Sequence, residues 1–131
     1  LGTLDEAAYQ SNLGLLLDAR GELDHAQRAH ERALALRRER LGPDHPECAH
    51  SLGNLGSIAA KRGDLQSAHA WHELALSVRQ KALGELSADA ARSQHNLALV
   101  ERRLGALAAA KDHAARAIKT WEQTLGADHP D

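Results

Sequence analysis

The chain has 131 residues, of which 43% are hydrophobic and 26% charged, with a formal net charge of -2 at pH 7. This charge argues against nucleic-acid binding, which favours strongly basic surfaces, and the longest apolar run is too short for a membrane span. A single cysteine, Cys48, excludes an internal disulfide framework and suits a reducing compartment, so we expect a cytoplasmic protein that binds neither nucleic acid nor membrane.

The first predicted element is a helix over about residues 4–20. Its apolar residues recur at spacings that a helix brings to one face: Ala7, Leu13, Leu16 and Leu17. Thr3 and Glu6 form a T-x-x-E capping box at its start. Gly21 is expected to end the helix, because glycine adopts freely the left-handed conformation common just after a helix.

A second helix is predicted over about residues 24–40. Its buried stripe consists mainly of small residues: Ala26, Ala29, Ala33 and Leu34. It is expected to end at Leu41-Gly42. Pro46 then suits the first position of the next helix, where its missing amide hydrogen costs nothing, and the acid of Glu47 suits the positive helix end.

The loop between these helices recurs along the chain. It reads LGPDHPE from residue 41, LGELSAD from residue 83 and LGADHPD from residue 125, a spacing of 42 residues each time. The same spacing relates further positions: Asn12, Asn54 and Asn96; Gly21, Gly63 and Gly105; Ala26, Ala68 and Ala110; Ala33, Ala75 and Ala117. Repetition at a period of 20 to 50 residues indicates a solenoid.

These patterns predict an all-α chain with one array over residues 1–131. The expected units are about 3–44, 45–86 and 87–128, and residues 129–131 would begin a further first helix. Ser87 and Asp89 provide the start of the first helix in the third unit. Since the sequence starts with Leu and stops where another helix would begin, we expect it to be a piece of a longer protein.

The unit resembles a known repeat. It has N-L-G or N-L-A in the first helix, Gly at the turn, A-L late in the second helix, and an L-G-x-D-H-P linker. This pattern resembles the tetratricopeptide repeat, in the 42-residue variety of the kinesin light chain and its bacterial relatives. The resemblance implies three helix-turn-helix repeats stacked into a right-handed superhelix. One departure is that His30, His72 and Ala114 stand where the family usually has Tyr or Phe, which predicts a thinner contact between helices and imidazoles that need a partner.

The resemblance also implies a function. First helices would line a concave face that binds an extended peptide or partner segment, and Asn12, Asn54 and Asn96 would hydrogen-bond its backbone, because a carboxamide offers both a donor and an acceptor. The alternative is that these asparagines tie one helix to its neighbour inside the stack.

Further residues are predicted on the same face, at neighbouring turns of the first helices. They make the face more basic toward the third unit and favour an acidic partner: Lys61, Arg92, His95, Leu99, Arg102 and Arg103. A carboxylate clamp of the family's kind is poorly matched, since only Arg92 fits a clamp position. Arg102 and Arg103 are equally explained as a solvated helix end.

Catalytic and metal-binding patterns give no support for an enzyme. The sequence has no Gly-rich phosphate loop and no nucleophile at a recognisable spacing from a base, so we expect a non-catalytic scaffold without cofactor. His69 and His72, with Glu73 beside them, have an acceptable ligand spacing. Because His72 occupies the aromatic place of the repeat, packing explains it first, and we expect no metal site.

The last predicted helix carries an apolar stripe that a solenoid would normally cover. Three large residues of this stripe are candidates for end-to-end self-association: Ile118, Trp121 and Leu125. Two alternative hypotheses therefore accompany peptide binding. The chain is a self-assembly unit that uses its ends, or it is a regulatory segment of a larger enzyme or signalling protein.

Overall fold

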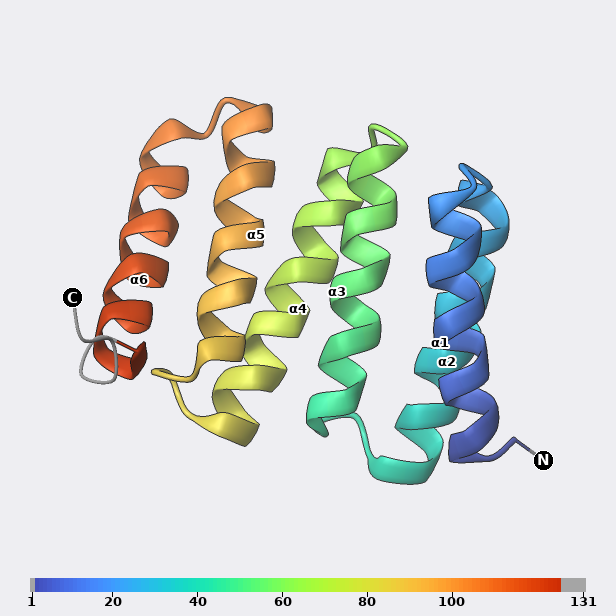
Figure 1. The fold of residues 1–131 in the computed structure, drawn as a ribbon. Helices are drawn as coiled ribbons and strands as arrows, with labels where there is room; N and C mark the ends of the chain where they lie inside the picture. Colours follow the sequence, from blue (N-terminus) through green and yellow to red (C-terminus); the bar gives the residue numbers. More distant parts are fainter. Residues whose placement is uncertain (1, 126–131) are drawn as a thin grey trace.

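The computed structural model describes residues 2–125, and this part of the chain is a row of α-helices without strands. The helices are α1 (Leu4–Ala19), α2 (Leu23–Leu41), α3 (Pro46–Lys61), α4 (Leu65–Leu83), α5 (Ala88–Leu104) and α6 (Leu107–Leu125). Each helix packs against the next along the chain, and the three pairs follow one another in space (Figure 1). The architecture is therefore an all-α helical-repeat solenoid, as predicted.

The division into units stays a prediction, with one helix pair falling inside each expected range. Residues 129–131, expected to begin another helix, lie outside the described residues. Among the described helices, none combines the length and the apolar character that crossing a membrane requires.

The helix starts follow the predicted capping chemistry. Oγ1 of Thr3 accepts a hydrogen bond from the amide of Glu6 at 3.0 Å, and Oγ of Ser87 accepts one from the amide of Ala90 at 3.0 Å. The second half of the predicted capping box does not form, because the carboxylate of Glu6 accepts instead from Arg32 on α2 at 3.1 Å. Pro46 is the first residue of α3, as predicted.

The helix ends follow from the recurring glycines. Gly21, Gly63 and Gly105 have φ angles of 80°, 83° and 83°, in the left-handed region that disfavours side chains. Each lies between the two helices of one pair, so the backbone reverses within a few residues. This reversal allows the two helices of a pair to pack along their length.

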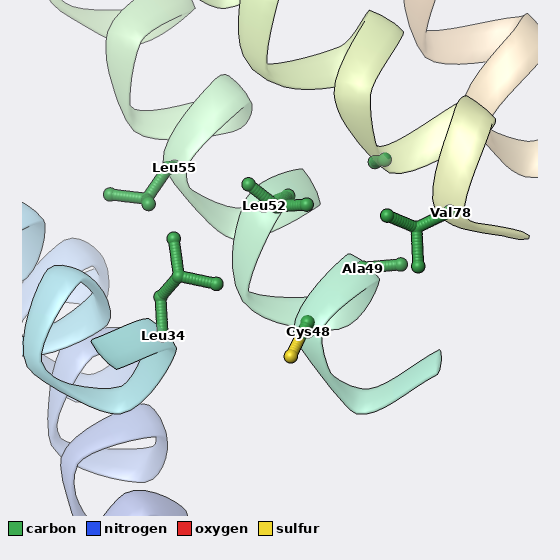
Figure 2. Packing of buried hydrophobic residues seen from close by; sticks show 7 residues of the cluster. Leu34, Cys48, Ala49, Leu52, Leu55 and Val78 are labelled. Carbon is green, nitrogen blue, oxygen red and sulfur yellow. The ribbon is translucent and has the colours of Figure 1, made fainter. Parts of the chain in front are cut away.

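The main apolar core lies in the second pair and extends to α2 of the first pair. Leu34 of α2 and Val78 of α4 pack with residues of α3 that include Cys48, Leu52 and Leu55 (Figure 2). Full burial of each leucine contributes about 1.5–3 kcal/mol. The predicted stripe of Ala26, Ala29, Ala33 and Leu34 is buried. Because α3 packs against both α2 and α4, one cluster holds two consecutive units together.

Inside the first two pairs, a histidine packs directly on a glycine. His30 lies against Gly14 and His72 against Gly56; a Cβ atom added to either glycine would lie 2.6 Å from Nε2 of the imidazole. The contact between the two helices, which the sequence predicted to be thin, is therefore close, because the glycine leaves room for the imidazole ring. Nδ1 of each ring is buried without a hydrogen-bond partner in the described part of the chain. Burial, followed by the charges of Arg79 and His69, lowers the pKa of His72 to about 4.

The junctions between units repeat one buried polar contact. Nη1 of Arg37 donates to Oγ of Ser51 at 2.7 Å, and Nη1 of Arg79 donates to Oγ of Ser93 at 2.8 Å. Each bond runs from the second helix of one pair to the first helix of the next. Burial lowers the pKa of Arg79, although the nearby charge of Asp89 opposes this effect. We call this contact the junction pair.

Leu16 corrects the prediction of a buried apolar face on α1, because its side chain is exposed. The residues 42 and 84 positions later, Ile58 and Val100, are buried. Val100 packs against α4, the second helix of the preceding pair, and α1 has no such helix in front of it within the described residues. Burial at this position thus depends on a neighbouring unit and not on α1 itself.

Candidate functional site

The first helices of the three pairs lie side by side and form one layer of the solenoid. Nζ of Lys61 on α3 lies 2.7 Å from Oδ1 of Asp18 on α1, and Nη1 of Arg103 on α5 donates to the carbonyl of Ala60 on α3 at 3.1 Å. These contacts join α1 to α3 and α3 to α5. We call this layer the asparagine face, after its repeated residues Asn12, Asn54 and Asn96.

A small hollow of about 150 Å³ lies on this face between α3 and α5. It is lined by His50, Gly53, Asn54, Ser57, Arg79, Arg92 and Asn96, and we call it the arginine hollow. Gly53 borders open space, since a Cβ atom added there would meet nothing within 4 Å. Nδ2 of Asn54 is buried and has no hydrogen-bond partner among the described residues. An acceptor brought into this hollow would find an unused donor.

The charges around the arginine hollow are mainly positive. Nη1 of Arg79 donates to Ser93 and also lies 3.4 Å from the carbonyl of Asp89, while Arg92 pairs with the carboxylate of Asp89 at 3.3 Å. Burial lowers the pKa of His50, and the charges of Arg37, Arg79 and Arg92 lower it further. The imidazole is therefore neutral at pH 7, and the two guanidinium groups set the local charge.

A second hollow of about 340 Å³ continues along the same two helices. It is lined by Ser57, Ala60, Lys61, His72, Asn96, Leu99, Val100, Arg102 and Arg103. Ser57 and Asn96 belong to both hollows, so the two form one continuous groove on the asparagine face. The amide of Asn96 thus lies at the centre of a groove with basic residues on both sides.

A third hollow of about 440 Å³ lies between α5 and α6. Its lining is largely apolar, with a basic rim: His95, Ala98, Leu99, Arg102, Leu107, Ala110, Lys111 and Ala114. Ala98 and Ala114 stand in the third pair where the first two pairs have glycine and histidine. The ring centroids of His95 and Trp121 are 5.8 Å apart beside this hollow. We call it the terminal hollow.

Comparison with known proteins decides the family. Models of the tetratricopeptide repeat match residues 5–81 and residues 90–131. The chain belongs to the tetratricopeptide repeat (TPR) family. The predicted resemblance is confirmed, and TPR repeats generally mediate protein–protein interaction. No curated protein matches the sequence.

Solved structures with the same fold include kinesin-light-chain-like TPR proteins. The crystal structure of BtubC (BKLC) from P. vanneervenii has a TM-score of 0.85 at 24% identity, covering 95% of this chain and 50% of that chain. A Podosopora anserina putative kinesin light chain with nearly identical TPR-like repeats has a TM-score of 0.84 at 22% identity, covering 99% of this chain and 62% of that chain. The TPR chain thus spans half to three-fifths of the length of these structures, and the likeness shows the fold.

The TPR structure brings most of the predicted peptide-binding residues together. Asn54, Asn96 and Arg92 line the arginine hollow, and Lys61, Leu99, Arg102 and Arg103 line the second hollow with Asn96. His95 lines the terminal hollow, and Asn12 is exposed on α1, one unit away. Lys61 and Arg103 also serve the contacts between first helices, so part of their charge is already used within the protein.

The sequence also places His50, Gly53 and Ser57 on the wall of this TPR groove, and all three line the arginine hollow. Sequence reasoning missed one lining residue of this hollow, Arg79. Arg79 comes from a second helix, which the resemblance places away from the concave face. A usable signal was present, because Arg37 and Arg79 are 42 residues apart, as are Ser51 and Ser93. A polar pair that recurs at the period of the repeat predicts a contact between units.

The two histidines considered as metal ligands, His69 and His72, make different contacts. Nε2 of His69 lies 3.0 Å from Oε2 of Glu101, whose other oxygen lies 2.7 Å from Nδ1 of His113. His72 is buried on Gly56 instead. Among the described residues, the structure contains no group of three or more His, Cys, Asp or Glu side chains that could hold a metal ion.

Proposed function

We propose that the chain is a non-catalytic interaction module that binds an extended segment of a partner protein along the concave, asparagine-bearing face. Asn12, Asn54 and Asn96 would hydrogen-bond the backbone of the bound segment. The single observation that carries this proposal is the unpartnered Nδ2 of Asn54 in a hollow between two first helices. A buried donor without a partner costs free energy, and a peptide carbonyl would satisfy it.

The charges of the groove support a partner with acidic residues. Arg79 and Arg92 face the arginine hollow, and Arg102 and Arg103 line the second hollow beside Leu99. A carboxylate near Arg92 would compete with Asp89 for the guanidinium group and form charge-assisted hydrogen bonds. The half-apolar second hollow would take a neighbouring aliphatic side chain. Cytoplasmic location belongs to the same proposal and fits a buried, free Cys48.

The groove sets a limit on affinity. Its two connected hollows span only α3 and α5, so few peptide residues are held at once. We expect micromolar binding at best, about -8 kcal/mol.

The direct test is a titration of the labelled protein with short randomised peptide pools, followed by NMR of the side-chain amide groups. One pool is enriched in Asp and Glu, and its counterpart carries Ser and Gln at the same positions. The proposal expects the Asn54 and Asn96 amide signals to shift with the acidic pool and less with the neutral one. Unchanged amide signals at saturating peptide, with either pool, would contradict peptide binding at this face.

Asn54→Ala should weaken peptide binding by about 1 kcal/mol, roughly five-fold in Kd, because one hydrogen bond to the peptide backbone is lost. Fluorescence anisotropy with a peptide selected from the acidic pool measures this change. Gln66→Ala is the matched control, since it removes an exposed carboxamide from α4, in the other layer. Equal affinities of wild type and Asn54→Ala would assign Asn54 to packing within the stack.

A further inference from the structure

The buried Arg–Ser contact of the internal junctions is replaced by aromatic residues at both ends of the described array. Internal junctions use the junction pair, with Arg37 on Ser51 and Arg79 on Ser93. The residue 42 positions after Arg79 is Trp121 on α6, and the residue 42 positions before Ser51 is Tyr9 on α1. Both halves of the polar pair are therefore aromatic at the ends. Tyr9 is 62% exposed, and Trp121 is only half-buried beside His95.

Apolar side chains at the two ends are likewise exposed, although their counterparts at an internal junction are buried. Val100 of α5 packs with Ala59 and Ala68, against Leu65 and Trp71 of the preceding unit, and is 3% exposed. The residue at this position of α1 is Leu16, which is 56% exposed. On α6 the positions that face a following unit hold Leu107, 61% exposed, and Ile118, 54% exposed.

The terminal hollow corresponds to the place that Val100 occupies in the preceding unit. Leu65 and Ala68, which pack with Val100, correspond to Leu107 and Ala110, and both of these line the terminal hollow. An aliphatic side chain presented by a first helix in the internal register would therefore enter this hollow. Leu16 of α1 is such a side chain.

We propose that the outer face of α6 binds α1 of a second copy of this chain, in the register of the internal junctions. Leu16 of the second copy enters the terminal hollow, its Tyr9 packs on Trp121, and its α1 covers Ile118. The proposal does not rest on peptide binding on the asparagine face, although Leu99 and Arg102 line both the second hollow and the terminal hollow. It retains two predicted self-association residues, Ile118 and Trp121; the side chain of the third, Leu125, lies outside the described residues.

A second copy is the favoured occupant because the contact continues an interface that the chain already forms twice. The exchange of Arg for Trp on one end is matched by the exchange of Ser for Tyr on the other, and aromatic pairs attract each other beyond simple burial. An unrelated partner on one end would explain the aromatic residue at that end only. It would not explain why Trp121 and Tyr9 occupy the two matching positions of the junction pair. Since the two faces differ, the contact is heterologous, and association continues beyond a dimer.

The test measures molar mass by sedimentation equilibrium and light scattering over a wide range of protein concentration. Wild type is expected to grow in mass past the dimer. Trp121→Arg and Tyr9→Ser should each weaken association about ten-fold or more, because each leaves an aromatic residue facing a polar one. The double variant Trp121→Arg/Tyr9→Ser should regain association, because it rebuilds the junction pair. Circular dichroism verifies that each variant is folded.

Leu86→Arg is the matched control, since it adds the same charge at an exposed leucine outside the proposed contact. It should associate like wild type, and loss of association in this variant would contradict the proposal. A constant monomer mass of the wild type at all concentrations would overturn it, as would growth that stops at a dimer. A double variant no better than Trp121→Arg alone would overturn the proposed register.

Discussion

Acidification from pH 6.5 to pH 4 is expected to remove about 3 kcal/mol of stability through His72 alone. The folded state holds this imidazole neutral, because burial first, and then Arg79 and His69, lower its pKa to about 4. The unfolded chain already binds a proton below pH 6.5, the ordinary pKa of a histidine. The contribution of His72 to stability is therefore complete above pH 6.5 and is lost progressively as the pH falls toward 4.

Urea denaturation at a series of pH values measures this loss. His30 has a lowered pKa of the same sign, so the wild-type slope contains both histidines. The double variant Gly56→Ala/His72→Ala removes the imidazole of His72 and keeps that of His30. Its free energy of unfolding should therefore fall less steeply between pH 6.5 and pH 4 than that of wild type. If wild type and double variant lose stability in parallel over this range, His72 is not the neutral, buried group that the structure indicates.

Gly56→Ala is expected to destabilise the protein by up to about 2 kcal/mol. The added Cβ atom would lie 2.6 Å from Nε2 of His72, and both residues are buried between α3 and α4. Overpacking of this kind costs about 1–3 kcal/mol, while the better helix propensity of alanine returns about 1 kcal/mol. Denaturation at pH 7, where His72 is neutral, measures the net effect.

Two variants separate crowding from a general effect of alanine on α3. Gly53→Ala lies on the same helix, where the added Cβ atom meets nothing within 4 Å, and should be neutral or stabilising by up to about 1 kcal/mol. His72→Ala should relieve the crowding, so its cost in the Gly56→Ala background should be smaller than in wild type. The third pair already combines Ala98 with Ala114. Additive effects of Gly56→Ala and His72→Ala would contradict the proposed fit of ring and glycine.

The sequence predicts those parts of the structure that depend on chemistry within one helix or turn. Thr3, Ser87 and Pro46 mark helix starts, and the recurring glycines mark the ends, because each acts on backbone groups a few residues away. The period of 42 residues extends these local predictions to the whole fold. The repeat therefore allowed six helices to be placed without any knowledge of their packing.

Contacts between units could not be predicted in the same way. Leu16 carries the pattern of a buried residue and is exposed, because burial there requires a helix from a preceding unit. Arg79 looks like a surface residue of α4 and instead lies in the groove, bonded to Ser93 on the next unit. The pairing of Glu101 with His69 and His113 joins three helices, and no sequence pattern within α5 predicts it. Such contacts depend on the angle at which units stack, which no local pattern specifies.

The pairing of Glu101 has a consequence for the order in which the array opens. The buried carboxylate of Glu101 connects α4, α5 and α6 through its contacts with His69 and His113, and a buried polar group that loses its hydrogen-bond partner costs about 1–3 kcal/mol. Two of the ion pairs that join the first unit to the second, Asp18–Lys61 and Asp24–Arg62, have lysine and arginine partners open to solvent. Exposed pairs contribute about 0–1 kcal/mol and weaken with salt. Cooperativity along the array is thus uneven. We expect α1 to fray first, earliest at high ionic strength, because α2 is also held to α3 by Leu34 in the apolar core and by the junction pair of Arg37 and Ser51. Amide hydrogens of α4 and α5 should exchange last.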